Sequence, residues 1–143
     1  MRLALLASLA LTLAACDSGL DLIDVDVAAL SHDPAALVGM WDLTTVTGSG
    51  YGSPPETTRP SYSERFTFRE DGTVQIELDG EVQETTYDVR RLDYGNGTQS
   101  DTPYLFLGDR TERFGLDGDR LYLDSREVDG PLNEYERVRY VAL

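Results

Sequence analysis

Several residue types that commonly carry chemistry are nearly absent from this sequence. Its 143 residues include one cysteine, one histidine and one tryptophan, and they include no lysine. A single cysteine excludes a disulfide within the chain, and a single histidine excludes a metal site built on paired histidines. No Gly-x-Ser-x-Gly nucleophile motif is present either. We therefore expect a protein that is not an enzyme, with no catalytic residues, no metal and no cofactor.

Positive charge is also scarce. All 12 basic residues are arginine, against 26 acidic residues, which leaves a formal net charge of -14. Nucleic acids and anionic lipid surfaces attract proteins of the opposite charge. This composition therefore argues against both of these partner classes.

Long apolar runs are missing except at the N-terminus, where Arg2 precedes a largely apolar stretch over residues 3–13. A basic residue, a short apolar run and small residues before a cleavage point are typical of a secretion signal. The run is too short to remain as a membrane-spanning helix. It ends in Leu-Ala-Ala-Cys, which resembles the bacterial lipobox and implies that Cys16 becomes the lipidated first residue of the mature chain. An ordinary signal peptide, with Cys16 buried nearby, is the alternative.

These features predict a signal peptide over residues 1–15, a lipidated and solvated tether over 16–32 that holds an exposed His32, and one domain over 33–143. The lipobox resemblance implies an extracytoplasmic protein of the bacterial cell envelope, attached to a membrane through its N-terminal lipid. Asp17 resembles the signal that retains some enterobacterial lipoproteins in the inner membrane. Whether the anchor lies in the inner or the outer membrane stays open.

The predicted domain begins with a turn that leads into a strand. Asp33 is able to cap a helical turn whose first residue is Pro34, and Gly39 is suited to end it. A β-branched run follows Trp41. We expect a one-turn plug with Trp41 at the floor of a β-barrel.

The rest of the chain has the alternation and the turn signals of short β-strands. Residues 48–61 are rich in Gly, Pro, Ser and Thr, which predicts a long loop without a strand. After this loop, Asp-Gly and Gly-Asp pairs separate alternating segments, which predicts hairpins. The expected strands cover residues 41–47, 62–69, 73–78, 81–92, 102–107, 110–115, 119–125 and 133–141.

Eight sequentially connected antiparallel strands predict an all-β protein, namely an eight-stranded up-and-down antiparallel barrel preceded by a short N-terminal helical turn. Closing the sheet into a barrel removes its free edges. A sandwich more often needs a long crossover connection in the middle of the chain, and the sequence shows none.

With Gly39-Met40-Trp41 at the start of the first strand, the chain resembles the lipocalin-like, calycin-type barrels of bacterial lipoproteins. The resemblance places residues 48–61 where lipocalins have a loop that partly covers the cup. It also implies that an arginine of the last strand packs over Trp41 and closes the barrel, which points to Arg137. Arg139 is the alternative, because one step in register would exchange the two.

Apolar residues that share the inward face of the strands either fill the barrel or line a pocket for a small ligand. Tyr51, Tyr62 and Tyr104 are candidates for the open end of the barrel. The candidate lining residues are Leu43, Phe66, Phe68, Val74, Ile76, Tyr87, Tyr104, Phe106, Leu121 and Leu123.

The function expected from this reading is the binding of a small hydrophobic or amphiphilic ligand by burial of apolar surface, with no covalent step. The alternative is a filled-core envelope scaffold or interaction module that contacts another envelope protein and holds no ligand. A large continuous cavity favours the first function, and a packed interior with an exposed apolar patch favours the second.

Overall fold

The computed structural model describes residues 25–48 and 54–139. The predicted signal peptide, Asp17, Cys16 and Tyr51 lie outside the described residues. Within the described part, no helix has the length and apolar character that crossing a membrane requires.

The described residues form nine β-strands and three short 3-10 turns. The strands are β1 (Gly39–Gly48), β2 (Glu56–Thr58), β3 (Glu64–Phe68), β4 (Thr73–Leu78), β5 (Glu81–Asp93), β6 (Gln99–Leu107), β7 (Arg110–Asp117), β8 (Arg120–Asp124) and β9 (Leu132–Arg137). The 3-10 turns are η1 (Val27–Ala29), η2 (Pro34–Leu37) and η3 (Arg126–Val128).

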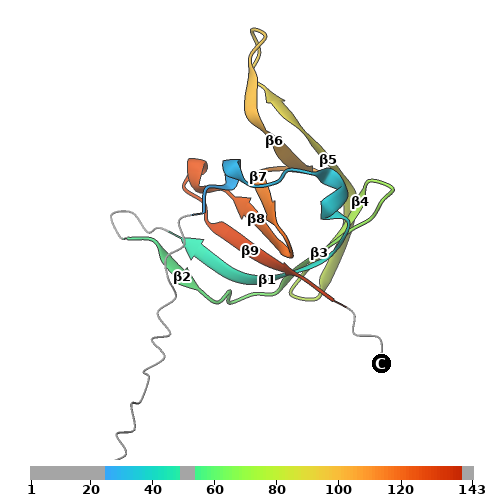
Figure 1. The fold of residues 1–143 in the computed structure, drawn as a ribbon. Helices are drawn as coiled ribbons and strands as arrows, with labels where there is room; N and C mark the ends of the chain where they lie inside the picture. The colour runs from blue at the N-terminus through green and yellow to red at the C-terminus, as the bar shows by residue number, and fades with distance from the viewer. Residues whose placement is uncertain (1–24, 49–53, 140–143) are drawn as a thin grey trace, which may run out of the picture.

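The strands form one antiparallel sheet in the order β2-β1-β3-β4-β5-β6-β7-β8-β9, and β1 also pairs with β9. This last pairing closes eight strands into a barrel and leaves β2 as an addition outside it (Figure 1). The predicted fold class is therefore confirmed. We call the end that holds η2, Gly39 and Arg137 the floor. The opposite end, with the β4–β5 and β6–β7 turns and the β8–β9 connection, is the mouth.

The turn chemistry follows the sequence closely. Asp33 caps η2 by accepting a hydrogen bond from the backbone N–H of Ala35 at 3.0 Å. In the β4–β5 turn both Asp79 and Gly80 have positive φ, 49° and 86°. This backbone is the type I′ turn that Asp-Gly favours in two-residue hairpins.

The prediction of a strand-free loop over residues 48–61 is wrong. Glu56–Thr58 forms β2 and pairs with Val46–Gly48 of β1, because β3 covers the same edge of β1 only from Gly39 to Asp42. Thr47 and Thr57 share a hydrogen bond between their hydroxyls at 2.8 Å. Threonine favours strands, but the surrounding Gly and Pro residues obscured this preference in the sequence.

From Val25 onward, the expected solvated tether is instead a strap packed on the barrel. Val27 is 2% exposed and packs with Tyr122 and Leu132, and the backbones of Ser31 and Leu116 pair as a bridge. Figure 1 shows this blue segment running from beside η3 across the barrel to η2. Arg126 of η3 donates to the carbonyl oxygen of Val25 at 2.9 Å, so the strap starts at the mouth and ends at the floor.

At the floor, Trp41 and Arg137 hold η2 against the barrel. The Arg137 guanidinium lies 4.1 Å from the centre of the Trp41 ring and donates to the carbonyl oxygens of Val38 at 2.8 Å and Ala36 at 2.6 Å. The Trp41 indole N–H donates to the carbonyl oxygen of Leu37 at 2.7 Å. Arg137, and not Arg139, therefore packs over the tryptophan.

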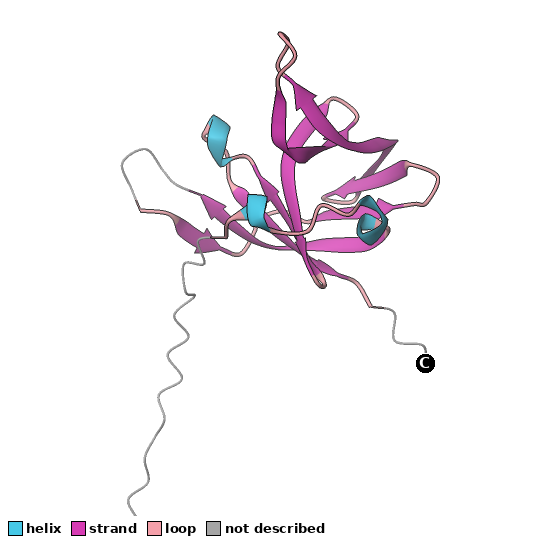
Figure 2. Ribbon diagram, turned by 45° about the horizontal axis from the view of Figure 1, so that its top comes forward, coloured by secondary structure: helices cyan, strands magenta, loops and turns pink. Residues whose placement is uncertain are grey.

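The β5–β6 hairpin projects from the barrel (Figures 1 and 2). The first half of β5, up to Thr86, pairs with β4, whereas the second half, from Tyr87, pairs with β6. β4 and β6 therefore pair with different halves of β5.

At Gly39 the floor of the barrel leaves no room for a side chain. Its φ is +136°, and a Cβ there would lie 2.6 Å from Nη1 of Arg137. We expect Gly39→Ala to lower the free energy of unfolding by about 3 kcal/mol, because it adds backbone strain and displaces a charged donor. Denaturant unfolding of the purified chain measures this.

Gly80→Ala is the matched control, since Gly80 also has positive φ but has no atom within 4 Å of the added Cβ. Its cost is expected to be about 1 kcal/mol, from backbone strain alone. Equal losses in the two variants would contradict the role assigned to the contact with Arg137.

Candidate functional site

The lower part of the barrel interior is filled by side chains. Trp41, Phe66, Phe114 and Tyr135 are 0% exposed, so no water-sized space touches them. The ring of Phe66 lies 5.7 Å from that of Phe68 and 5.1 Å from that of Tyr135. These residues form a packed core in which an apolar tail finds no room.

Most of the predicted lining residues take part in this core. Phe66, Phe68, Val74, Leu121 and Leu123 are buried in it, and Leu43, Ile76 and Tyr87 are partly buried against it. Core positions that the sequence prediction left out are Leu37, Leu105, Leu107, Phe114, Leu116 and Tyr135.

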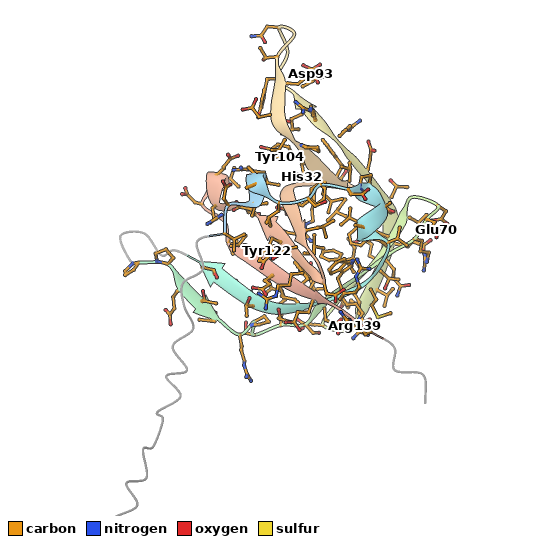
Figure 3. The ribbon with its side chains drawn as sticks, viewed as in Figure 1. His32, Glu70, Asp93, Tyr104, Tyr122 and Arg139 are labelled. Carbon is orange, nitrogen blue, oxygen red and sulfur yellow. The ribbon has the colours of Figure 1, made fainter. Side chains whose placement is uncertain are left out.

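The inward placement of Tyr104 and Phe106 is wrong. Leu105 and Leu107 fill the interior from β6, at 0% and 2% exposure, and Phe106 lies outside under the guanidinium of Arg90, 4.2 Å from its ring centre. Both faces of this strand are apolar, so alternation could not fix the phase, and a single step exchanges the faces. Tyr104, labelled in Figure 3, lies near the base of the β5–β6 hairpin, where its hydroxyl is 3.4 Å from Glu127.

Towards the mouth, the interior changes from apolar to polar. Glu64 of β3 points inward and its side chain is 6% exposed. Its carboxylate accepts a hydrogen bond from the Tyr135 hydroxyl at 2.6 Å and pairs with Nη1 of Arg110 at 3.0 Å. Arg110 also contacts Glu112 at 3.3 Å, and Glu112 accepts from the Ser125 hydroxyl at 2.6 Å. We call these five residues the mouth cluster.

Burial and charge shift the pKa values of two members of the mouth cluster, Tyr135 and Arg110. Burial raises the pKa of Tyr135 well above its ordinary value, and the charge of Glu64 and its hydrogen bond raise it further. For Arg110, burial by itself would lower the pKa, but the Glu64 charge and hydrogen bond outweigh it, so the pKa is raised. Tyr135 therefore remains a neutral donor, and Arg110 remains a cation.

Asn133 of β9 borders the mouth cluster and leaves one polar atom unused. The residue is 9% exposed, and it lies two residues before Tyr135 on the inward face of β9. Its side-chain carbonyl oxygen is buried and has no hydrogen-bond partner among the described residues. Buried polar atoms are nearly always paired, so this oxygen requires an explanation.

An exposed apolar side chain stands directly beside the mouth cluster. Leu78 pairs with Glu64 across β3 and β4, so both side chains lie on the inward face. Leu78 is nevertheless 47% exposed. The mouth thus combines a buried carboxylate and a half-exposed guanidinium, whose side chains are 6% and 42% exposed, with an exposed apolar side chain.

The surface depressions on the described part of the chain include two that are lined by charged side chains. One, of about 360 Å³, opens on the wall where β1 leaves β3 and is lined by Asp42, Leu43, Ser63, Glu64, Arg65 and Glu77. Arg65 and Asp42 form an ion pair within it. The other, of about 430 Å³, lies at the floor, where Asp119 pairs with Arg137 and Arg139. In both depressions, charged side chains are therefore already paired with other side chains of the protein.

His32 is not exposed as expected. It packs edge-on against Phe114 at 5.3 Å between ring centres, and burial followed by the charge of Arg113 lowers its pKa. Figure 3 labels it on the strap. Across residues 25–48 and 54–139, no three His, Cys, Asp or Glu side chains are grouped to hold a metal ion.

Strand alternation in the sequence indicates part of the mouth cluster, which the predicted lining residues did not include. Glu64 has the same strand phase as Phe66 and Phe68, which places a carboxylate on the buried face. Asn133 and Tyr135 alternate in the same way on β9. What the sequence could not show is that these residues meet Arg110, which lies more than 40 residues from Glu64.

Comparison of the chain with protein-family models, with curated proteins and with solved structures finds no match. The function is therefore argued from the geometry of the mouth.

The hydroxyl of Tyr135 is expected to contribute measurably to stability. Tyr135→Phe leaves the buried Glu64 without one donor, so we expect the free energy of unfolding to fall by about 1–3 kcal/mol. Tyr104→Phe removes a hydroxyl from an exposed contact and is expected to change it by less than about 0.5 kcal/mol. Denaturant unfolding of both variants checks this, and similar values would count against a structural hydrogen bond to Glu64.

Proposed function

We propose that this protein is a lipid-anchored, extracytoplasmic, lipocalin-like barrel of the bacterial cell envelope that binds a small amphiphilic ligand at its mouth, with no covalent step. One observation carries the proposal. A buried, hydrogen-bonded carboxylate, Glu64, lies next to the exposed Leu78 on the inward face of the barrel.

The cost of burying charge supports a role in recognition. Removing a carboxylate from water costs several kcal/mol, and apolar residues of similar volume often give equal or better stability. Glu64 bears this cost, because its side chain is 6% exposed, whereas its partner Arg110 keeps 42% of its side chain exposed. A barrel that serves only as a scaffold does not require a carboxylate at this inward position. A site that must hold a polar group, however, needs such side chains in fixed positions.

The packed core determines where such a ligand lies. Since Trp41, Phe66 and Tyr135 are fully buried, the ligand does not extend down to the floor. It places its polar group at the mouth cluster and a short apolar part over Leu78. The residues predicted to line a deep pocket instead support this shallow site from below.

The strap orients the mouth with respect to the proposed anchor. Its described part begins at Val25, beside η3 at the mouth. Cys16 precedes Val25 by nine residues, a span of at most about 30 Å in a fully extended chain. A lipid on Cys16 would therefore hold the mouth near the membrane surface, where amphiphiles concentrate.

A protein-interaction module is the second candidate function. Its support would be a contiguous exposed apolar surface, but Val82, Tyr94 and Val128 are exposed on three separate elements, β5, the β5–β6 tip and η3. Single exposed apolar residues are common on protein surfaces. The mouth is therefore the better-supported site.

Replacing Leu78 tests the position of the ligand. The full chain is placed in phosphatidylcholine nanodiscs and titrated by calorimetry with hexan-1-ol, hexylammonium and hexanoate, with empty nanodiscs as the blank. Leu78→Ser is expected to weaken the best probe about fivefold, because about 1 kcal/mol of apolar burial is lost.

Val82→Ser is the matched control, since Val82 pairs with Glu77 and faces outward on the same hairpin. We expect unchanged affinity in this variant. If no probe binds the unmodified chain, or if Val82→Ser loses as much affinity as Leu78→Ser, the proposed function is wrong.

The lipid anchor has its own test. In a bacterial host, Cys16→Ser is expected to abolish incorporation of labelled fatty acid and to release the chain from the membrane fraction. Ser18→Ala, two residues away, is expected to keep both the label and the membrane association. A Cys16→Ser chain that still carries the lipid would refute this anchor.

A further inference from the structure

We propose that the polar group of the ligand is a protonated amine, which donates hydrogen bonds to the side-chain carbonyl oxygen of Asn133 and to the mouth cluster. This inference rests on the proposed function and specifies the ligand class of the same site.

The unpartnered oxygen of Asn133 is the first observation. It is a buried acceptor without a donor among the described residues, in a side chain that is nine-tenths buried. A buried acceptor that has lost water and gained no donor bears the full cost of its desolvation. A ligand that brings an N–H group removes this cost, whereas a ligand that brings only acceptors does not.

The hydrogen-bond inventory of the mouth cluster points the same way. The hydroxyl of Tyr135 donates to Glu64, and the hydroxyl of Ser125 donates to Glu112. The guanidinium of Arg110 serves both carboxylates. The two hydroxyl donors of the cluster are thus engaged, and the guanidinium already serves two carboxylates, while each carboxylate oxygen still has lone pairs to offer. An ammonium group supplies up to three donors and accepts none.

Charge distinguishes an amine from a carboxylate ligand. Glu64 and Glu112 carry two formal negative charges against one positive charge on Arg110, so the cluster has one negative charge in excess. A ligand carboxylate would be the third acidic group around a single guanidinium. A ligand ammonium balances the cluster instead.

Tyr62 borders the same site. It lies just before β3 and is partly exposed. Burial, followed by the charge of Glu64, raises the pKa of its phenol, which is consistent with a position beside the mouth cluster. Because Tyr62 belongs to the connection that leads into β3 and not to a strand, its ring is able to move without breaking the barrel. In the proposed complex, the ligand displaces this ring to reach Asn133.

The calorimetric comparison of three probes with the same six-carbon chain tests the inference on the full chain in nanodiscs. We expect hexylammonium to bind at least tenfold more tightly than hexan-1-ol, and hexanoate to bind most weakly. Asn133→Leu, which keeps the volume but removes the acceptor, is expected to reduce hexylammonium affinity at least tenfold and to remove most of its preference over hexan-1-ol, which has a single donor.

Asn133→Asp is a second variant, for which the expected change in hexylammonium affinity has the opposite sign. It converts the acceptor into a carboxylate, and we expect tighter hexylammonium binding. Asn96→Asp makes the same chemical change at the exposed tip of the β5–β6 hairpin, and we expect no change there. This control separates the local effect from the general attraction of a cation to an acidic protein.

The outcomes separate this inference from the proposed function. Failure of all three probes to bind overturns both. Binding of hexan-1-ol or hexanoate as tightly as hexylammonium overturns only the amine assignment, and so does an Asn133→Leu chain that keeps its preference for hexylammonium. Equal gains in Asn133→Asp and Asn96→Asp would show attraction by net charge, which also overturns it.

Discussion

The contact between Arg137 and Trp41 is the interaction on which the rest of the structure depends. The guanidinium stacks on the indole and donates to two carbonyl groups that η2 and its C-terminal end leave unsatisfied. It thereby joins the first and last strands of the barrel to the plug that closes the floor. With the floor closed and the interior filled above it, the mouth is the end at which the barrel interior is polar and reachable.

The barrel changes character along its axis. Near the floor, aromatic and leucine side chains pack without accessible surface, and this packing supplies the apolar burial that stabilises the fold. Near the mouth, Glu64, Arg110 and Tyr135 form a hydrogen-bonded cluster that adds little net stability by itself. The apolar and the charged side chains of the interior are thus separated along the barrel axis.

The strap contributes to both ends. It begins beside η3 at the mouth, covers Gly115 of β7 with Leu30, and ends in η2 at the floor. Gly115 has no space for a Cβ, because Leu30 atoms would lie within 2.9 Å of it. The segment that leads into the first strand is thus part of the packing of the barrel.

The sequence by itself determined the class of the fold, the plug and the hairpin turns, because these depend on local chemistry: caps, Asp-Gly turns and strand alternation. The resemblance to lipocalin-like barrels also pointed to Gly39, Trp41 and Arg137 as the closure of the barrel, with Arg139 left as the alternative to Arg137. Only the tertiary structure decided the phase of β6, where both faces are apolar, and the pairing of β2, which depends on the edge of β1 that β3 leaves free. The mouth cluster was likewise decided by closure of the barrel, because it joins residues from β3, β7 and β9 that no local rule relates.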